Sequence, residues 1–374
     1  MRFDHESGPS VSPILILIDD FGQGGAQRQI AMMVREFVRR GRKVIVCRYA
    51  ERDFLGDEIA AAGAEVVRLE GGGRLGWLRS LSRLVRERQP AVLCAFLVGP
   101  ATLAILSDRL NRMPCPIVVC ERCADSDGPI SMKRRLGLAL YRRAQAIVCN
   151  SERQARWLKG ACPALRDRIG CIGNAVDLEL FPASPPPGGQ VRRVVVLGRV
   201  VEVKGVAVLA NALDVLRARS DANVVPSIEW YGQHHEQGLE LCSDAGASGT
   251  GIEFMPPLVD VPALLRSADA VLLPSLSEGT PNVVLEAMAA GRVVLTTDVG
   301  DCSKMVLDGS TGWVVAPDDP EALADGLAVL CSAGEEVIQR MSRAARTRAE
   351  QIASIGRIVD EYEALFEGLG VGTT

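Results

Sequence analysis

The chain has 374 residues, enough for two domains, and its 48% hydrophobic and 24% charged residues are typical of a packed globular protein. The net charge of −4 argues against a nucleic-acid-binding protein. Residues 1–190 hold 28 Lys/Arg and 20 Asp/Glu, a net of +8, and residues 191–374 hold 14 and 26, a net of −12. We therefore expect the two halves to meet different partners.

We expect no signal peptide, because residues 1–12 are polar and the apolar run Ile14–Ile18 is too short for a signal core or a membrane span. We expect this run to form the first strand. A loop with Gly24 and Gly25 follows, and then a helix over Ala26–Arg40. A glycine loop between a strand and a helix can present free N–H groups to an anion, although glycines also serve tight turns.

Alternating strands and helices continue to about residue 185 and predict a doubly wound α/β domain. The expected strands are Val44–Arg48, Ala64–Arg68, Ala91–Phe96, Ile117–Cys120 and Ala146–Cys149, with helices near Asp57–Ala62, Leu75–Arg88, Ala101–Arg109 and Met132–Arg143. Residues that follow the strands are expected to line the ligand cleft. Glu121 and Arg122 are either placed for a ligand or form an ordinary ion pair, and Ser151 is either a cleft residue or a helix N-cap.

The 11 cysteines are odd in number and scattered, so we expect reduced thiols and a cytoplasmic protein. Cys120 and Cys123 form a lone C-x-x-C, and a zinc site would need a second pair or nearby histidines. The only histidines are His5, His234 and His235. We therefore predict no metal site.

A proline- and glycine-rich break at 184–189 is the expected linker to a second α/β series. Its first strand, Val194–Leu197, is followed by a loop with Arg199 and Lys204. Arginine can bind two phosphate oxygens at once and lysine acts as a point charge, although a basic pair in a loop is often only solvated surface. Further strands are expected at Ile228–Tyr231, Ile252–Met255 and Trp313–Val315, with helices at Val206–Ala218, Val261–Ala268, Pro320–Leu330, Glu335–Ile352 and Ile355–Glu367.

The stretch Ala270–Thr297 predicts a βαβ unit with strands at Val271–Leu273 and Val293–Leu295, the first of which is followed by a polar, glycine-bearing loop. A helix is expected to start at Pro281 or just after it. Glu278 lies in the loop and Glu286 in the first turns of the helix, where an acid can also simply stabilise the helix dipole. Such a loop, at the carboxyl end of a strand, is where open α/β sheets bind ligands.

The string Ser-x-x-Glu-Gly-x-Pro-Asn-x-x-x-Glu-Ala-Met-Ala-x-Gly at 275–291 resembles the signature of the retaining nucleotide-sugar glycosyltransferases of family 4, which have the GT-B fold. Gly-Arg-x-x-x-x-Lys-Gly at 198–205 looks like the diphosphate clamp of that family. Gly-Gly-Ala-x-Arg at 24–28 resembles its loop facing the donor phosphates and the acceptor, and 254–258 resembles its base-contacting segment. The resemblance spans residues 24 to about 366 and is weaker before residue 185.

The resemblance implies two Rossmann-like domains facing a central cleft. The acceptor-side domain would comprise residues 1–185 with the C-terminal helix at about 353–374, and the donor-binding domain residues 190–352. The activity implied is transfer of a sugar from a nucleoside diphosphate sugar, with UDP favoured, to a saccharide or lipid-linked saccharide with retention of configuration. GT-B enzymes characteristically need no divalent metal, so we expect no cofactor besides the donor substrate.

By the same resemblance, Glu278, Arg199 and Lys204 would be catalytic, with the diphosphate on Arg199 and Lys204, the sugar on Glu278 and the ribose on Glu286. The complete set of expected donor contacts is Gly24, Gly25, Arg199, Lys204, Pro257, Leu258, Glu278, Gly279, Thr280, Pro281, Asn282 and Glu286.

One departure affects the acceptor side. Many relatives have a histidine after the fourth strand, where this chain has Phe96 and Leu97, so acceptor contacts cannot be transferred from them. The alternatives are a nucleotide-sugar epimerase of the same fold and a non-catalytic nucleotide-sugar binding subunit. An NAD-dependent oxidoreductase would need the G-x-G-x-x-G fingerprint, which this chain lacks.

The expected helix Ile130–Arg143 carries five basic residues besides its apolar side: Lys133, Arg134, Arg135, Arg142 and Arg143. It is either an ordinary amphipathic helix on the sheet or a peripheral contact with an anionic membrane surface at the inner membrane face.

Overall fold

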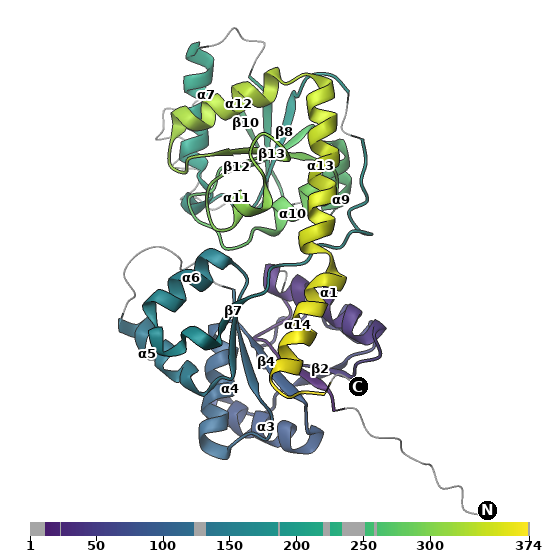
Figure 1. Cartoon of the computed structure of the whole chain (residues 1–374), viewed down its shortest axis with the longest axis vertical. Helices are drawn as coiled ribbons and strands as arrows, with labels where there is room; N and C mark the ends of the chain where they lie inside the picture. The colour runs from purple at the N-terminus through teal and green to yellow at the C-terminus, as the bar shows by residue number, and fades with distance from the viewer. Residues whose placement is uncertain are drawn as a thin grey trace, which may run out of the picture. The chain divides into compact units, whose positions relative to one another are not determined.

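The computed structural model describes residues 12–22, 24–122, 132–185, 188–219, 225–233, 251–257 and 260–372. The chain divides into two compact units, Met1–Gly173 with Ile355–Thr374, and Asn174–Ser354. Each unit has one sheet of parallel strands with helices on both faces (Figure 1). The predicted doubly wound α/β architecture is therefore confirmed.

The first unit has a seven-stranded sheet in the order β3-β2-β1-β4-β5-β6-β7. Its strands are β1 (Ile14–Leu17), β2 (Val44–Arg48), β3 (Glu65–Arg68), β4 (Val92–Phe96), β5 (Ile117–Glu121), β6 (Ala146–Cys149) and β7 (Ile169–Cys171). Its helices are α1 (Gly25–Arg39), α2 (Gly56–Ala61), α3 (Gly73–Arg88), α4 (Val98–Asn111), α5 (Met132–Leu140), α6 (Glu152–Ala161) and α14 (Ile355–Gly368), with the 3-10 turns η1 (Tyr141–Arg143) and η2 (Pro163–Arg168). Strand β7 was not predicted, because three residues with a central glycine give no alternation to detect. Ser151 is confirmed as the N-cap of α6, since its Oγ accepts the Gln154 N–H at 3.3 Å.

Helix α14 belongs to the first unit although it ends the chain. It lies beside α1 in Figure 1, and the rings of Phe37 and Phe366 stack with centroids 6.2 Å apart. The Arg40 guanidinium donates to Asp360 at 2.6 Å, to Glu363 at 2.7 Å and to the carbonyl of Gly356 at 2.8 Å. Apolar stacking and an ion-pair network thus both hold this helix.

The second unit has a six-stranded sheet in the order β10-β9-β8-β11-β12-β13. Its strands are β8 (Arg193–Leu197), β9 (Ser227–Tyr231), β10 (Ile252–Met255), β11 (Ala270–Leu273), β12 (Val293–Thr297) and β13 (Gly312–Val315). Its helices are α7 (Val206–Arg219), α9 (Val261–Ser267), α10 (Asn282–Ala289), α11 (Cys302–Met305), α12 (Pro320–Ser332) and α13 (Glu335–Ala353), with the 3-10 turn η3 (Glu202–Lys204).

Side chains along the strands of this sheet alternate between two apolar layers. On β8, Val194 and Val196 pack in the core that includes α7 and α12, whereas Val195 packs in the core that includes α10 and α13. Leu272 and Leu273 of β11 divide in the same way. Because both faces are covered, the strands are continuous apolar runs without polar alternation.

The boundary between the units lies earlier than the expected linker at 184–189. The chain enters the second unit at Asn174, the Val176 N–H donates to the carbonyl of Ala353 at 2.8 Å, and Phe181 is buried in the core that includes α10 and α13. Residues 174–185 therefore belong to the second unit, since their packing outweighs the composition of the proline-rich stretch that follows.

The predicted basic helix is α5 followed by η1, and Ile130 lies outside the described residues. Leu138 and Tyr141 are 1% exposed in the core, and Arg143 pairs with Asp108 at 2.6 Å. The amphipathic interpretation therefore holds for these side chains. Among the described residues, no helix is both long and apolar enough to cross a membrane.

Candidate functional site

The second sheet reverses its winding between β8 and β11, which are neighbours although β9 and β10 separate them in sequence. The loops that follow these two strands, 198–205 and 274–281, therefore leave the same edge of the sheet side by side. In open parallel sheets such a switch point is where ligands bind. The predicted residues Arg199, Lys204 and Glu278 all lie in these two loops.

Lys204 and Glu278 contact each other directly across the switch point. The Lys204 Nζ donates to the Glu278 Oε1 at 2.5 Å, and the Ser275 Oγ donates to the same oxygen at 2.7 Å. The side chains of Lys204 and Glu278 are 22% and 13% exposed, so both are largely shielded from water but still accessible. The attraction is stronger there than on an open surface, and it fixes the positions of both charges.

Two glycines let the loops of this site approach closely. Gly205 has φ +73°, and a Cβ at this position would overlap the carbonyl oxygen of Pro274. Gly300, with φ +56°, does the same for the loop after β12, where a Cβ would overlap the carbonyl oxygen of Gly279. The Asp301 N–H donates to that carbonyl at 3.1 Å. Only glycine meets both requirements, a left-handed backbone and no side chain.

Helix α10 begins at the predicted place, with Pro281 as its N-cap. No side chain caps it and its first turn holds no acidic residue, so the positive end of the helix dipole is not neutralised there. The Asn174 Nδ2 donates to the carbonyl of Thr280 at 2.9 Å and to the Asn282 Oδ1 at 2.8 Å, which fixes the start of the helix. Glu286 is half-buried one turn after Asn282, on the same face of α10.

The other predicted donor residues lie in separate segments of the chain. Arg199 is exposed, and its side chain makes no hydrogen bond or ion pair with any residue that the structure describes. Pro257 is exposed after β10, and Leu258 lies outside the described residues. Gly24 and Gly25 form the N-cap and the first residue of α1 in the first unit.

In the first unit, the charged pair after β5 has a structural role. Glu121 is fully buried and accepts hydrogen bonds from Arg134 at 2.9 and 3.2 Å and from the Tyr141 hydroxyl at 2.5 Å. Burial, and then the Glu121 carboxylate, raises the pKa of Tyr141, so the phenol remains a donor. Arg122 instead donates to the Tyr362 hydroxyl at 2.7 Å on α14. The predicted ion pair between Glu121 and Arg122 is therefore wrong, because Glu121 pairs with Arg134.

A cavity of about 470 Å³ lies between the first turns of α3 and α4 in the first unit. The rings of Tyr49 and Trp77 line it with centroids 4.6 Å apart, and Arg74 lies beside them. Burial, with Asp19 and Asp20 adding to its effect, raises the pKa of the Tyr49 phenol to about 12. At neutral pH the cavity therefore offers an apolar wall and a neutral hydroxyl. It was not predicted, because its residues come from separate elements and share no motif.

Two residues of the second-unit site were also missed by sequence reasoning. Ser275 could have been found, since it is the first residue of the signature string. Asn174 could not, because it follows the unpredicted strand β7 and its partner Asn282 is 108 residues away.

Two family models match the chain. The model described as Glycosyltransferase Family 4 matches residues 23–180, and the model described as Glycosyl transferases group 1 matches residues 191–333. The second match contains Lys204, Glu278 and Glu286.

Curated relatives include D-inositol 3-phosphate glycosyltransferases. The protein of Nocardia farcinica is 28% identical over 280 residues, which cover 67% of this chain and 61% of the relative. The protein of Mycobacterium avium is 30% identical over 271 residues, which cover 66% of this chain and 63% of the relative. The aligned part is thus less than two thirds of the length of these relatives.

Solved structures of similar fold include Anabaena HepE in complex with UDP, with a TM-score of 0.78 at 19% identity over 95% of this chain and 100% of HepE. The lipopolysaccharide outer core galactosyltransferase WaaB has a TM-score of 0.74 at 15% identity over 95% of this chain and 99% of its own. At these identities the likeness is evidence of fold alone. The chain therefore contains a Glycosyltransferase Family 4 domain followed by a Glycosyl transferases group 1 domain, and it has the GT-B fold.

Proposed function

We propose that the chain is a glycosyltransferase that moves a sugar from a nucleoside diphosphate sugar, with UDP as the favoured nucleotide, to a saccharide or lipid-linked saccharide acceptor with retention of configuration. The observation that carries this proposal is the Lys204–Glu278 contact at the switch point, within the region that matches the group 1 glycosyltransferase model. Support also comes from HepE, whose structures contain UDP and UDP-glucose, and from relatives named as glycosyltransferases.

In this proposal, different loops of the second unit bind different groups of the donor. Lys204 and Arg199 bind the diphosphate, and the N–H groups of Gly279, Thr280 and Asn282 at the start of α10 add the helix dipole. Glu278 accepts from sugar hydroxyls and Glu286 from the ribose diol, since a carboxylate has acceptor positions for two hydroxyls. The cations and the helix start neutralise the leaving group, which is the role a divalent metal has in other transferases. Activity should accordingly be insensitive to EDTA.

The transfer step requires no imidazole base. The bond from the anomeric carbon to the β-phosphate oxygen breaks, and its electron pair stays on that oxygen. The acceptor oxygen bonds to the anomeric carbon on the same face, and its proton passes to the departing phosphate. Lys204 and Arg199 stabilise the charge that develops on the phosphate. NMR of the new linkage tests this, because an inverted product contradicts the step.

We propose that the acceptor binds to the first unit. The cavity lined by Tyr49 and Trp77 suits an apolar or ring-shaped part of the acceptor. Trp77→Ala should raise the KM for the acceptor and leave the affinity for the free nucleotide unchanged. An unchanged KM would exclude this cavity from acceptor binding.

The proposal as a whole is tested by mass spectrometry of the co-purified donor, followed by a donor panel with the variants Lys204→Ala and Arg199→Ala. Loss of a charge-assisted contact costs about 1.5–3 kcal/mol, or about 10- to 150-fold in donor affinity. Arg340→Ala, an exposed arginine on α13, is the control. Wild-type affinity in both site variants would contradict the assignment. Donor turnover without acceptor would indicate an epimerase, and binding without any turnover a non-catalytic subunit.

A further inference from the structure

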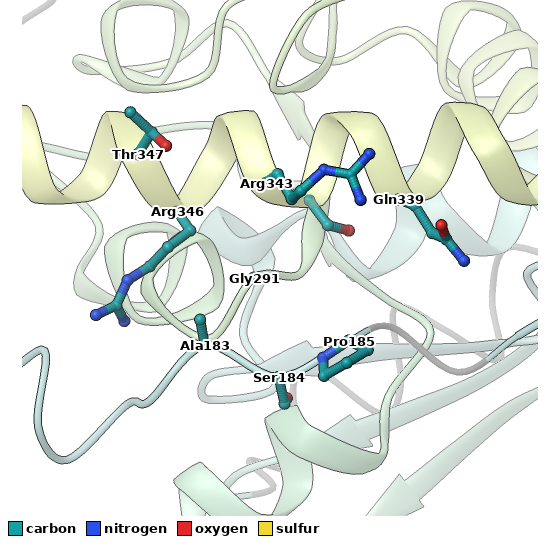
Figure 2. Close-up of a pocket in the computed structure, with 9 residues that line it drawn as sticks. Ala183, Ser184, Pro185, Gly291, Gln339, Arg343, Arg346 and Thr347 are labelled. Carbon is teal, nitrogen blue, oxygen red and sulfur yellow. The ribbon is translucent and has the colours of Figure 1, made fainter.

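A second cavity, of about 580 Å³, lies in the second unit between α13 and the segment Ala183–Pro185 (Figure 2). It is built from residues that the proposed reaction does not use. Gly291, in the turn between α10 and β12, also lines it. Its size is that of a small-molecule site.

A buried positive charge lies directly behind this cavity. Arg292 is 0% exposed, and its guanidinium donates to the carbonyls of Ser184 at 3.0 Å, Pro185 at 3.2 Å and Gly291 at 3.2 Å, three residues that line the cavity. It also donates to the Ser184 Oγ at 2.5 Å and to the carbonyls of Leu265 and Arg266 at 2.5 and 2.9 Å. No carboxylate among the described residues makes a hydrogen bond to Arg292.

Burial lowers the pKa of Arg292 to about 10, with Asp269 opposing from a greater distance, so the group is still charged at neutral pH. The backbone N–H groups of Arg192 and Arg193 already hold the Asp269 carboxylate at 2.8 Å. Carbonyl dipoles solvate the Arg292 charge but do not neutralise it, and a buried cation without a counter-ion is costly. An anion in the cavity would offset that cost.

The wall of the cavity on α13 presents further donors on one helical face. Gln339, Ser342, Arg343 and Arg346 follow one another at the spacing that places side chains on the same side of a helix. Ser342 is 3% exposed, and its Oγ is buried with no hydrogen-bond partner. Arg343 forms no hydrogen bond or ion pair with any described residue, and Figure 2 shows it extending along α13 toward Gln339.

Two acids near the cavity are already engaged. Glu350 pairs with the Arg346 Nε at 2.5 Å, and Glu335 accepts from the Gln339 Nε2 at 2.9 Å. The Arg346 Nη1 donates to the carbonyls of Phe181 and Ala289 at 2.7 and 2.6 Å. The uncompensated charge around the cavity is therefore positive, carried by Arg292 behind its floor and Arg343 on its wall.

We propose that this cavity binds the phosphoryl group of a small phosphorylated metabolite, separately from the sugar donor. Arg343 would take two phosphate oxygens with its planar fork, and the Ser342 hydroxyl would donate to a third. The ligand would tie Ala183–Pro185, shortly after the first crossing of the chain into this unit, to α13, which ends just before the chain leaves it. It would thereby join two segments of the second unit that are far apart in the sequence.

The test is isothermal titration of the full chain, saturated with UDP, using inorganic phosphate and glucose 6-phosphate as probes. We expect binding of both probes, at least tenfold weaker in Arg343→Ala and weaker in Ser342→Val, and unchanged in Arg340→Ala. Arg340 is an exposed arginine on the same helix that does not line the cavity, and it controls for loss of a positive charge.

Four outcomes would overturn the proposal: no binding of either probe at millimolar concentration, equal weakening by Arg340→Ala, displacement of the probes by UDP, or equal affinity for citrate. The affinity for UDP itself should not change in Arg343→Ala. A failure of UDP to bind the wild type would count against the proposed glycosyltransferase function, and the titrations would then be repeated without it, leaving this site to be judged on its own.

Discussion

Glu278 and Glu286 belong to the same signature string but have different surroundings. Glu278 lies in a loop and accepts hydrogen bonds from Lys204 and Ser275, whereas Glu286 lies on α10, one turn after Asn282. A loop carboxylate held by a lysine can exchange partners when a charged ligand arrives. A carboxylate on a helix is held more rigidly and suits a fixed part of the ligand such as the ribose.

We predict that Glu286→Ala weakens binding of free UDP and of the full donor alike, because both contain the ribose. Glu278→Ala should leave UDP affinity nearly unchanged and weaken only the full donor and turnover, since the sugar is lost as a contact. Titration of both ligands against both variants measures this, with Glu336→Ala on α13 as an exposed control. If both variants affect UDP equally, the division of roles is wrong.

At the scale of elements, the site depends on how closely the loops after β8 and β11 approach. Gly205 and Gly309 both have positive φ, +73° and +68°, but a Cβ would overlap Pro274 at the first position and meets nothing within 4 Å at the second. The comparison therefore separates backbone strain from steric overlap within one unit.

We predict that Gly309→Ala costs about 1–2 kcal/mol of stability, the strain of a left-handed alanine, and leaves donor affinity unchanged. Gly205→Ala should lower stability by more than this and should also weaken donor binding. The loop must move away from Pro274, and this movement would break the contact between Lys204 and Glu278. Denaturant unfolding and donor titration of the two variants measure this. Equal donor affinity in both would show that the close approach of the loops is not needed for binding.

Helix α5 and η1 present fewer free charges than their sequence indicates. Arg134 pairs with the buried Glu121, and Arg143 pairs with Asp108. Arg135 and Arg142 are exposed, and the side chain of Lys133 is not among those that the structure describes. Among the described side chains of this helix, a contact with an anionic membrane should therefore depend on these two arginines.

If the membrane contact exists, the double variant Arg135→Ala with Arg142→Ala should lower binding to anionic vesicles about 30-fold, at roughly 1 kcal/mol per residue. The measurement is flotation with anionic and neutral liposomes at low and high salt. The double variant Arg86→Ala with Arg88→Ala, at the end of α3, is the control. Absence of salt-sensitive binding by the wild type would favour an acceptor that is not in a membrane.

At the scale of the whole molecule, Arg40 links the N-terminal helix α1 to the C-terminal helix α14. This residue is 23% exposed and joins Glu36 on α1 to Asp360 and Glu363 on α14, so one guanidinium bridges segments more than 300 residues apart. The docking of the C-terminal helix therefore depends on charge as well as on the stacked Phe37 and Phe366 rings.

Arg40→Ala should destabilise the protein by about 2 kcal/mol, a value at the low end for several charged hydrogen bonds because Asp360 is 68% exposed. Arg68→Ala, which breaks an exposed pair with Glu51, should cost less than about 1 kcal/mol. Urea unfolding at pH 7 compares the two variants. Equal costs would show that the network does not hold α14.

The same network predicts a dependence on pH. Hydrogen bonds from Arg39, and then from Arg40, lower the pKa of Glu36 against the opposing effect of burial. Because the folded pKa lies below the unfolded value of about 4.5, this stabilisation is present above pH 4.5 and is lost as the pH falls through the folded pKa. Glu36→Gln should therefore be less stable than wild type at pH 7, and the difference should shrink below pH 4.5. A difference independent of pH would assign the effect to packing.

Most of the fold could be predicted from local pattern. Of the thirteen strands in the part of the chain that the structure describes, twelve were expected within one or two residues, because buried parallel strands are short apolar runs bounded by glycine, proline or charged residues. Strand β7 was missed because Ile-Gly-Cys is too short for such a run. The candidate site residues Lys204, Glu278 and Glu286 could be named from the sequence because they lie in short strings that resemble a known signature.

By itself, the sequence determined the alternation of strands and helices, the two α/β series and the residues that carry the donor signature, since all of these depend on neighbours within about ten positions. Tertiary structure decided which charges meet. Lys204 and Glu278 are 74 residues apart in the sequence, and Asn174 and Asn282 are 108 residues apart. Glu121 accepts hydrogen bonds from Arg134 and Tyr141, and its neighbour in the sequence, Arg122, has a different partner. The physical reason is that ion pairs and hydrogen bonds depend on distance in space and on exclusion of water, and only the order of strands in a sheet brings distant loops to one edge.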